Sequence, residues 1–205
     1  MVCTLFLLAG LAGPLAGTAT ASVGGPYYQV TWGLAAGNSA TLLVVPDGTG
    51  NPLTAARNPF GQIVDATIHL QANDDSGPLQ GVPAADLWLG AEDEGLVLCA
   101  GGSTADHATD ALGHTEWTRP LLAGGHSQAP CHVYVNGHGV QAGVLALKFN
   151  SPDIDGNLRV DLSDVARFAA DFVGHYAFRS DLIRDGSVNL SDIVEMNRAL
   201  GRKCP

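Results

Sequence analysis

Residues 153–164 carry oxygen-bearing side chains at regular intervals. Positions 1, 3, 5, 9 and 12 of this twelve-residue segment are Asp153, Asp155, Asn157, Asp161 and Asp164, and position 7 offers the carbonyl of Arg159. This spacing suits Ca²⁺, which takes about 6 to 8 oxygen ligands at roughly 2.3–2.6 Å from a tight loop. The four carboxylates would repel one another without a cation. The segment therefore predicts a calcium-binding loop.

A second copy of the pattern begins 28 residues later, at residues 181–192. Its predicted ligands are Asp181, Asp185, Ser187 and Asp192. Position 3 is Ile183, which removes one ligand, so we predict a complete first site and a weaker second one. The alternative is that each polar segment caps a helix and binds no metal.

Each loop precedes a predicted helix. Apolar residues recur at helical spacing from Leu162 to Phe172 and again from Ile193 to Leu200, and Gly201 is expected to end the second helix. The first loop has Leu158 at position 6, where calcium loops usually need glycine for a sharp turn. Gly156 is expected to relieve part of that strain.

The duplicated loop-helix pattern resembles the dockerin module. Both copies end in V-[DN]-L-S-D-[VI], and both close with aspartate, at Asp164 and Asp192, as dockerin loops do. The resemblance covers roughly residues 151–201. It implies calcium-dependent folding and docking onto a cohesin-like protein partner.

In dockerins, loop positions 10 and 11 contact the cohesin. Here they are Leu162-Ser163 and Leu190-Ser191, which are identical in the two copies. The resemblance therefore implies that either repeat can face a partner, in two orientations related by a half-turn. Alternatively, the two leucines pack the helices against each other or against the preceding domain.

Catalytic patterns are weak throughout the chain. Five of the seven histidines lie between His107 and His138, yet no HExxH or HxH spacing occurs, so we expect exposed histidines on separate turns and strands. No GxSxG elbow is present, and the acidic run 92–94 is expected to be a solvated loop tip. We therefore expect a protein that binds rather than catalyses.

The composition favours a folded, mainly β protein. The 205 residues include 26 glycines, 46% are hydrophobic and 6% aromatic, which is typical of short strands joined by turns. The net charge of −10 and the lack of a basic run argue against nucleic acid as a partner. Residues 1–150 carry a net charge of −8 and residues 151–205 a net charge of −2, which indicates a boundary near 150.

The first residues predict export. A short apolar stretch followed by Ala19-Thr20-Ala21 indicates a signal peptide over residues 1–21, although a positive start is missing. No later stretch is long and apolar enough to span a bilayer, so we expect the mature chain outside the cytoplasm or at the cell surface. In that compartment we predict a disulfide between Cys99 and Cys131, with Cys204 free or cross-linked to another molecule.

Eight strand-like runs lie between residues 27 and 149. They are 27–32, 39–45, 63–71, 85–89, 96–99, 115–118, 132–135 and 144–149, each bounded by turn residues, and their spacing predicts a β-sandwich over residues 22–149. The pieces Asp74–Pro78, Gly81-Val82-Pro83 and Thr109–Gly113 resemble bacterial immunoglobulin-like domains of the invasin and intimin kind. A dockerin-like module would follow at 150–205.

The sequence thus predicts an immunoglobulin-like β-sandwich followed by a small α-helical, dockerin-like module with two calcium-binding repeats. We expect the module to attach the sandwich to an extracellular protein partner. Two other readings stay open. The chain could self-assemble as a surface fibre or adhesin that calcium makes rigid, or the sandwich could bind or cleave a polysaccharide through Trp32, Trp88 and Trp117.

Overall fold

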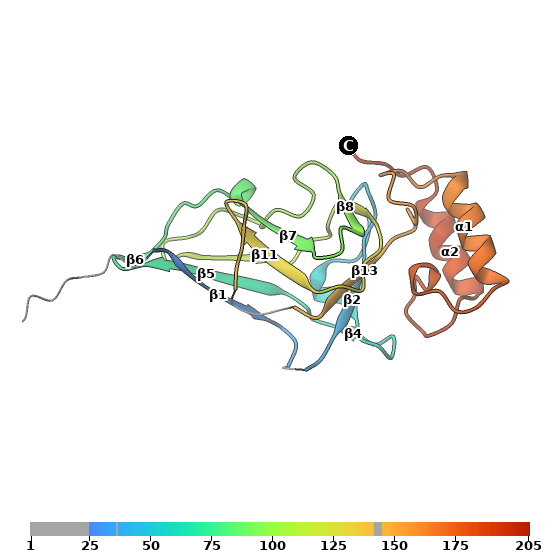
Figure 1. Ribbon diagram of the computed structural model, residues 1–205, viewed down its shortest axis with the longest axis horizontal. Coiled ribbons are helices and arrows are strands. Elements are labelled where there is room, and N and C mark those ends of the chain that lie inside the picture. The colour runs from blue at the N-terminus through green and yellow to red at the C-terminus, as the bar shows by residue number, and fades with distance from the viewer. Residues whose placement is uncertain (1–24, 36, 142–144) are drawn as a thin grey trace, which may run out of the picture.

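The computed structural model describes residues 25–35, 37–141 and 145–205, so the signal peptide predicted over 1–21 lies outside the described residues. The fold is mainly β, as the sequence predicts. Figure 1 shows an elongated molecule with strands over most of its length and two helices, α1 (Leu162–Phe172) and α2 (Leu190–Ala199), side by side at one end. No helix in the described ranges is long and apolar enough to cross a membrane.

The strands form small sheets around a shared core. One sheet contains β1 (Tyr27–Trp32), β5 (Ile68–Asp74), β6 (Gly77–Pro78) and β9 (His114–Trp117). A second runs in the order β13 (Leu147–Asn150), β2 (Ala40–Leu43), β3 (Ala56–Arg57) and β4 (Ile63–Val64). A third contains β12 (His138–Gly139), β11 (Cys131–Val135) and β7 (Leu87–Ala91), and β10 (Ala123–Gly125) pairs with β8 (Leu96–Leu98). Only β13 and β2 are parallel among the named pairs, an arrangement consistent with a sandwich.

Strand β2 is buried on both faces. Leu42 and Val44 belong to the large core between the sheets, which also contains Trp117 and Phe149. Leu43 and Val45 point the other way and pack with residues of the loop-helix segment. A strand covered on both sides needs no alternating polar residues, which explains the continuous apolar run at this point in the sequence.

The cluster on the far side of β2 joins the helical segment to the strands. It contains Leu43, Val45, Ile154, Val160, Phe168, Leu182, Met196 and Ala199. Since both calcium-type loops and both helices contribute to it, this cluster (the junction core) fixes the loop-helix segment directly on the sheet. Arg202 reinforces the contact with an ion pair to Asp47, Nη1 to Oδ2 3.0 Å.

Three predicted strands differ informatively from the observed ones. The run 63–71 divides into β4 and β5, because Asp65 turns the chain and accepts hydrogen bonds from the amide and hydroxyl of Thr67. The run 85–89 begins with a 3₁₀ turn, η2 (Ala84–Asp86), before β7. The start of the run 144–149 touches residues outside the described ranges, and β13 begins at Leu147. Short 3₁₀ turns also occur at η1 (Leu53–Ala55) and η3 (Phe178–Ser180).

The predicted disulfide pairing is wrong. Cys99 pairs with Cys204, with a Cα–Cα distance of 5.8 Å, while Cys131 lies on β11 as a free, fully buried thiol of the large core. The C-terminal tail returns to the first loop, where the amide of Gly201 donates to the carbonyl of Val160, and this brings Cys204 to the end of β8. Burial raises the pKa of the Cys131 thiol to about 12, so this cysteine stays protonated and unreactive.

We predict that Cys204→Ser lowers the free energy of unfolding by about 2 to 5 kcal/mol, because the bridge closes a long loop in the unfolded chain. The two cysteines are 105 positions apart. Urea denaturation of the oxidised protein measures the change. Cys131→Ala is the control, since it leaves the bridge intact; peptide mapping that found Cys131 in a disulfide would contradict the assignment.

Candidate metal centre

The first loop is built by backbone amides that donate to its carboxylates. Asp153 accepts from the amides of Asn157 (3.1 Å) and Leu158 (2.8 Å). Asp164 accepts from the amides of Asp155 (3.1 Å) and Asp161 (2.9 Å). The loop therefore folds around these two acidic side chains, which must lie inside it to reach the amides.

A capping box fixes the end of the loop. The side chain of Asp161 accepts from the amide of Ser163, and the side chain of Asp164 accepts from the amide of Asp161, so α1 starts at Leu162. This capping box is the helix capping that was predicted as the alternative to metal binding. It also holds the Asp164 carboxylate at a fixed angle to the loop, so helix capping and metal binding are compatible at this residue.

Strand β10 packs closely against the first loop. A Cβ atom on Gly124 of β10 would lie only 1.7 Å from Oδ2 of Asp153, and the amide of Gly125 donates to the carbonyl of Asp153 at 2.7 Å. Only glycine leaves room for the carboxylate here. The close approach explains a strand made of Ala-Gly-Gly, which the sequence analysis did not identify.

Three acidic side chains meet in this loop. Asp153, Asp155 and Asp164 each place a carboxylate oxygen within 4.8 Å of the others. Asp153 and Asp164 are fully buried. Oxygen donors at this spacing fit a hard divalent cation, so these residues could hold a metal ion.

The charges of the loop are poorly compensated by the protein. Burial, and next the neighbouring Asp164, raise the pKa of Asp153 to about 6. Burial likewise raises the pKa of Asp164. Arg167 approaches the cluster only at its edge, with Nε 3.5 Å from Oδ2 of Asp155 and half of its side chain exposed. A bound cation would remove the cost of keeping these acids ionised.

The other predicted ligands of the first loop lie near its rim. Asn157 is exposed, and its side-chain oxygen accepts from the amide of Arg159 at 2.9 Å. Arg159 is also exposed, and it pairs with Lys203 in an isolated β-bridge. The structure therefore brings three of the six predicted ligands into one group. Asn157 and Arg159 lie beside it, and Asp161 caps α1.

The second loop repeats the four hydrogen bonds from backbone amides to aspartate side chains that are described for the first loop. Asp181 accepts from the amides of Asp185 and Gly186, both at 3.1 Å. Asp192 accepts from the amides of Ile183 and Asn189, both at 2.9 Å. Every one of these contacts lies 28 positions after its counterpart, and Asn189 caps α2 as Asp161 caps α1. The two segments thus share one local fold.

The two loops have left-handed residues at the same two positions, but they differ in which position is glycine. Loop positions 4 and 6 have positive φ in both copies: Gly156 (70°) and Leu158 (67°) in the first, Arg184 (62°) and Gly186 (89°) in the second. Each loop therefore has one glycine and one strained non-glycine residue. The predicted strain at Leu158 exists, and Gly156 takes up the other left-handed position.

Arg184 supplies the second loop with a positive charge. Its Nη1 lies 3.2 Å from Oδ2 of the fully buried Asp181, and its Nε donates to Oγ1 of Thr41 at 3.1 Å. The hydroxyl of Tyr176 donates to the same Asp181 oxygen at 2.9 Å, and the guanidinium stacks 4.7 Å from the ring centre of Phe178. Arg184 and Tyr176 thus compensate the negative charge of Asp181, the first residue of this loop.

The remaining predicted ligands of the second loop do not gather as in the first. Asp192 is buried, whereas Asp185 and Ser187 are exposed and bonded to each other. In the part of the chain that the structure describes, residues 181–192 provide no group of three carboxylates with oxygens within 4.8 Å of one another. The role of Arg184 was missed in the sequence, although aligning the two copies places it opposite Gly156.

The four predicted partner-binding residues lie on the surface. Leu162 is 75% exposed and Leu190 is 71% exposed, and Ser163 and Ser191 are exposed beside them. The alternative in which the leucines pack the helices together is therefore wrong; Phe168, Met196 and Ala199 do that in the junction core. Each helix presents an apolar side chain to solvent in its first turn.

A second ligand group lies on the strands. His69, His114 and Glu116 bring ligand atoms within 4.8 Å of one another. The histidine spacing between 107 and 138 predicted separate, exposed histidines, and His69 lies outside that range. The strand alternation of His114 and Glu116 was the signal available, but their approach to His69 depends on a pairing between distant strands.

Comparison with protein families, curated proteins and solved structures gives no match for this chain. The resemblances to dockerins and to immunoglobulin-like domains therefore depend on the motifs quoted above.

The raised pKa of Asp153 predicts an unusual pH dependence of stability for the metal-free protein. The folded-state pKa of about 6 lies above the ordinary value of 3.8, so between these values the native chain binds a proton that the unfolded chain does not. Stability therefore rises as pH falls through this window. With a chelator present, we expect a Tm about 2 to 4 °C higher at pH 5 than at pH 7, or about 1 kcal/mol.

Asp153→Asn is the control for this measurement, because it removes the titrating group. The control is needed because burial lowers the pKa of His126, which acts in the opposite direction as that histidine becomes protonated in the unfolded chain. We expect the variant to lose the part of the rise that comes from Asp153, while Asp164 and Asp192, whose pKa values burial also raises, keep their part. Equal pH profiles for both proteins, followed by differential scanning calorimetry, would contradict the assignment.

Proposed function

We propose that this protein is an exported calcium-binding protein whose loop-helix segment attaches its β domain to another extracellular protein. One observation carries the proposal: two fully buried aspartates and a third acid converge in a loop that offers them no buried positive partner. Calcium is the ion proposed because all the donors are oxygens and the loop spacing is that of calcium loops. Asp153, Asp155 and Asp164 would hold the ion, with Asn157 and the Arg159 carbonyl completing the shell.

The second loop is proposed to bind calcium more weakly. Asp181 already has Arg184 and Tyr176 as partners, and an incoming ion would have to displace the guanidinium. Ile183 offers no ligand at position 3. The two repeats would then have the same fold but different responses to calcium.

The attachment surface is proposed to be formed by the first turns of the two helices. Leu162 with Ser163 and Leu190 with Ser191 present the same chemistry twice, and exposed apolar side chains of this kind are typical of partner-binding surfaces. The dockerin resemblance suggests a cohesin-like domain as the partner. Because Asp164 both caps α1 and belongs to the acidic group, ion binding would hold one half of this surface in place.

The β domain, proposed to be immunoglobulin-like, would be the part that is attached. The resemblance to invasin-type domains and the predicted signal peptide favour a location outside the cell or on its surface. The Cys99–Cys204 bridge fits such a compartment, where disulfides persist.

We predict that calcium titration of the full chain by calorimetry gives one tight site that belongs to the first loop. Asp164→Asn should weaken this site by about tenfold or more, because asparagine carries no negative charge and offers only one oxygen, and outer-shell changes alone cost that much. Asp192→Asn, the same change in the second repeat, should leave the tight site unchanged. The two variants are matched, since both acids are buried and close the same capping box.

The double variant Ile183→Asp/Arg184→Gly provides the converse control. It gives the second loop the residues that the first has at positions 3 and 4, and it should create a second tight site. Absence of any calcium heat from the wild-type chain would disprove the proposal, as would equal losses in the two single variants.

Attachment is tested with the calcium-loaded chain against immobilised cohesin domains in biolayer interferometry. If either repeat can face the partner, Leu162→Asp or Leu190→Asp alone should leave binding within about threefold, and the double variant should abolish it. Because both leucines are exposed, we expect the variants to stay folded, and circular dichroism checks this point.

Two other experimental results would favour a different function. Calcium-dependent growth of particles in light scattering, without cohesin binding, would favour a self-assembling surface fibre. Binding or hydrolysis of a polysaccharide by the chain would favour an accessory protein of polysaccharide degradation. Self-assembly without cohesin binding would contradict attachment to a separate partner, and hydrolysis would overturn the prediction that the protein binds rather than catalyses.

A further inference from the structure

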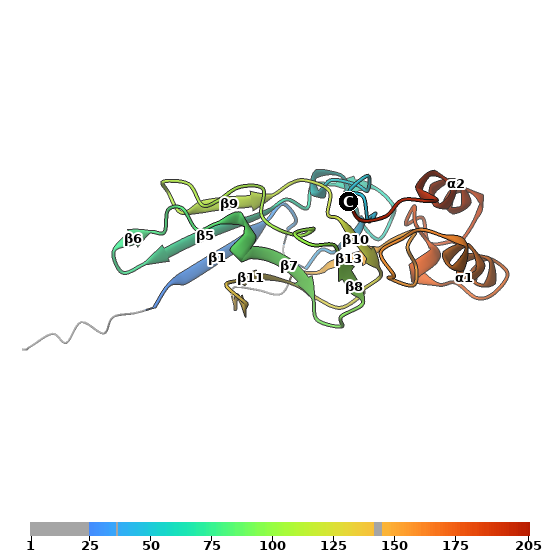
Figure 2. The ribbon, with the colours of Figure 1, turned by 90° about the horizontal axis from the view of Figure 1, so that it is seen from above.

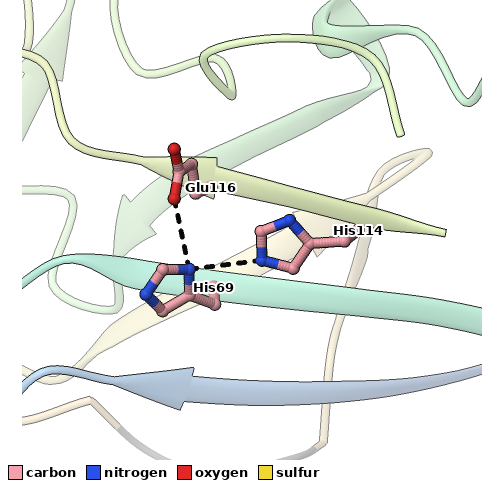
Figure 3. A group of neighbouring side chains, drawn as sticks. All are labelled: His69, His114 and Glu116. Carbon is pink, nitrogen blue, oxygen red and sulfur yellow. Dashed lines mark hydrogen bonds and ion pairs between the residues drawn. The ribbon is translucent and has the colours of Figure 1, made fainter. Parts of the chain in front are cut away.

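The outer face of the β1–β5–β9 sheet gathers three potential metal ligands. His69 on β5 lies directly opposite Glu116 on β9 in the antiparallel register. His114 precedes Glu116 by two residues and shares its face, while Thr115 and Trp117 between and after them are buried in the core. Figure 3 shows the three side chains converging above the two strands.

The distances within this group match the edges of a metal coordination tetrahedron. Nδ1 of His69 lies 3.3 Å from Oε2 of Glu116 and 3.3 Å from Nε2 of His114. A tetrahedral zinc ion with bonds of about 2.0–2.1 Å to nitrogen and oxygen separates its ligand atoms by about 3.3–3.4 Å. The third pair, between His114 and Glu116, lies within 4.8 Å, and the half-exposed Glu116 side chain can turn to shorten it.

Hydrogen bonding satisfies this arrangement poorly. One ring nitrogen of His69 faces both neighbours, yet it carries either a proton or a lone pair. A proton on this nitrogen would have to be shared between the Glu116 carboxylate and the lone pair of His114, and a lone pair on it would face the carboxylate. Both contacts also exceed the usual range of about 2.7–3.2 Å for a hydrogen bond. A divalent cation accepts a lone pair from all three groups at once.

The site has a rigid support and access to solvent. The β5–β9 register extends over four residue pairs, and Ile68 and Leu70 anchor β5 in the large core with Trp117 behind β9. The side chains of His69 and Glu116 are 39% and 32% exposed, so an ion can enter from solution. Preorganised ligands lose little conformational entropy when they bind.

We propose that His69, His114 and Glu116 form a zinc-binding site whose fourth position is open to water. Imidazole nitrogens favour zinc and similar transition metals, whereas calcium selects oxygen donors. Three protein ligands and one open position are the arrangement of zinc sites that accept water or an external ligand. This site is separate from the calcium loops and lies on a different sheet from the strand that supports the first loop.

Zinc titration of the full chain, monitored by calorimetry in excess calcium, tests the proposal. We expect one zinc equivalent. His114→Gln and Glu116→Gln should each weaken binding by about tenfold or more, because both remove a direct ligand at the protein surface. Cobalt added in place of zinc should give the visible absorption of a four-coordinate ion.

Two variants separate this site from other binding. His132→Gln removes a histidine that faces only one carboxylate, that of Glu92, and should leave zinc binding unchanged. Asp155→Asn alters the first loop and should leave zinc binding unchanged while weakening calcium. The proposal is overturned if zinc gives no heat, if His114→Gln binds as the wild type does, or if cobalt shows only a six-coordinate spectrum. These outcomes are independent of whether calcium binds.

Discussion

The burial of two aspartates inside a twelve-residue loop is the constraint on which the loop-helix segment depends. Asp153 and Asp164 organise the backbone by accepting four amide hydrogen bonds, and this requires them to be inside. Inside, each is desolvated and repels the other, which raises the pKa of Asp153 to about 6. The hydrogen bonds that define the loop and the electrostatic cost that opposes it thus come from the same two side chains.

The loop cannot relieve that cost by opening, because other contacts hold it closed. Asp153 lies against the bare backbone of Gly124, Ile154 and Val160 are buried in the junction core, and the tail beyond α2 is bonded back to Val160 and bridged to Cys99. Figure 2, seen from above, shows this tail passing from α2 towards the strands. The first loop is therefore held by contacts with β2 and β10 as well as with the helices.

The sequence alone predicted the bounds of secondary structure where the determining interactions are local. Strand β1 has its predicted bounds, and α1 and α2 begin where the capping residues Asp161 and Asn189 stand, because alternation and capping act within a few residues. Prediction from the sequence failed where two interacting residues are far apart in the chain. The approach of Asp153 to Gly124, the pairing of Cys99 with Cys204, and the meeting of His69 with Glu116 all join segments far apart in the chain, and residue type alone does not specify such contacts.

The pair of repeats shows that one backbone fold can be stabilised by different charge arrangements. Both loops use the same amides, the same capping box and the same two left-handed positions. At position 4 the first has Gly156, whose missing side chain leaves the acids without an internal cation, and the second has Arg184, which lies over Phe178 and reaches Asp181. Any partner that contacts only Leu162 or Leu190 would meet the same surface twice, whereas an ion would distinguish the two loops. The two repeats therefore share the exposed Leu-Ser pair at positions 10 and 11, while the charges inside their loops differ.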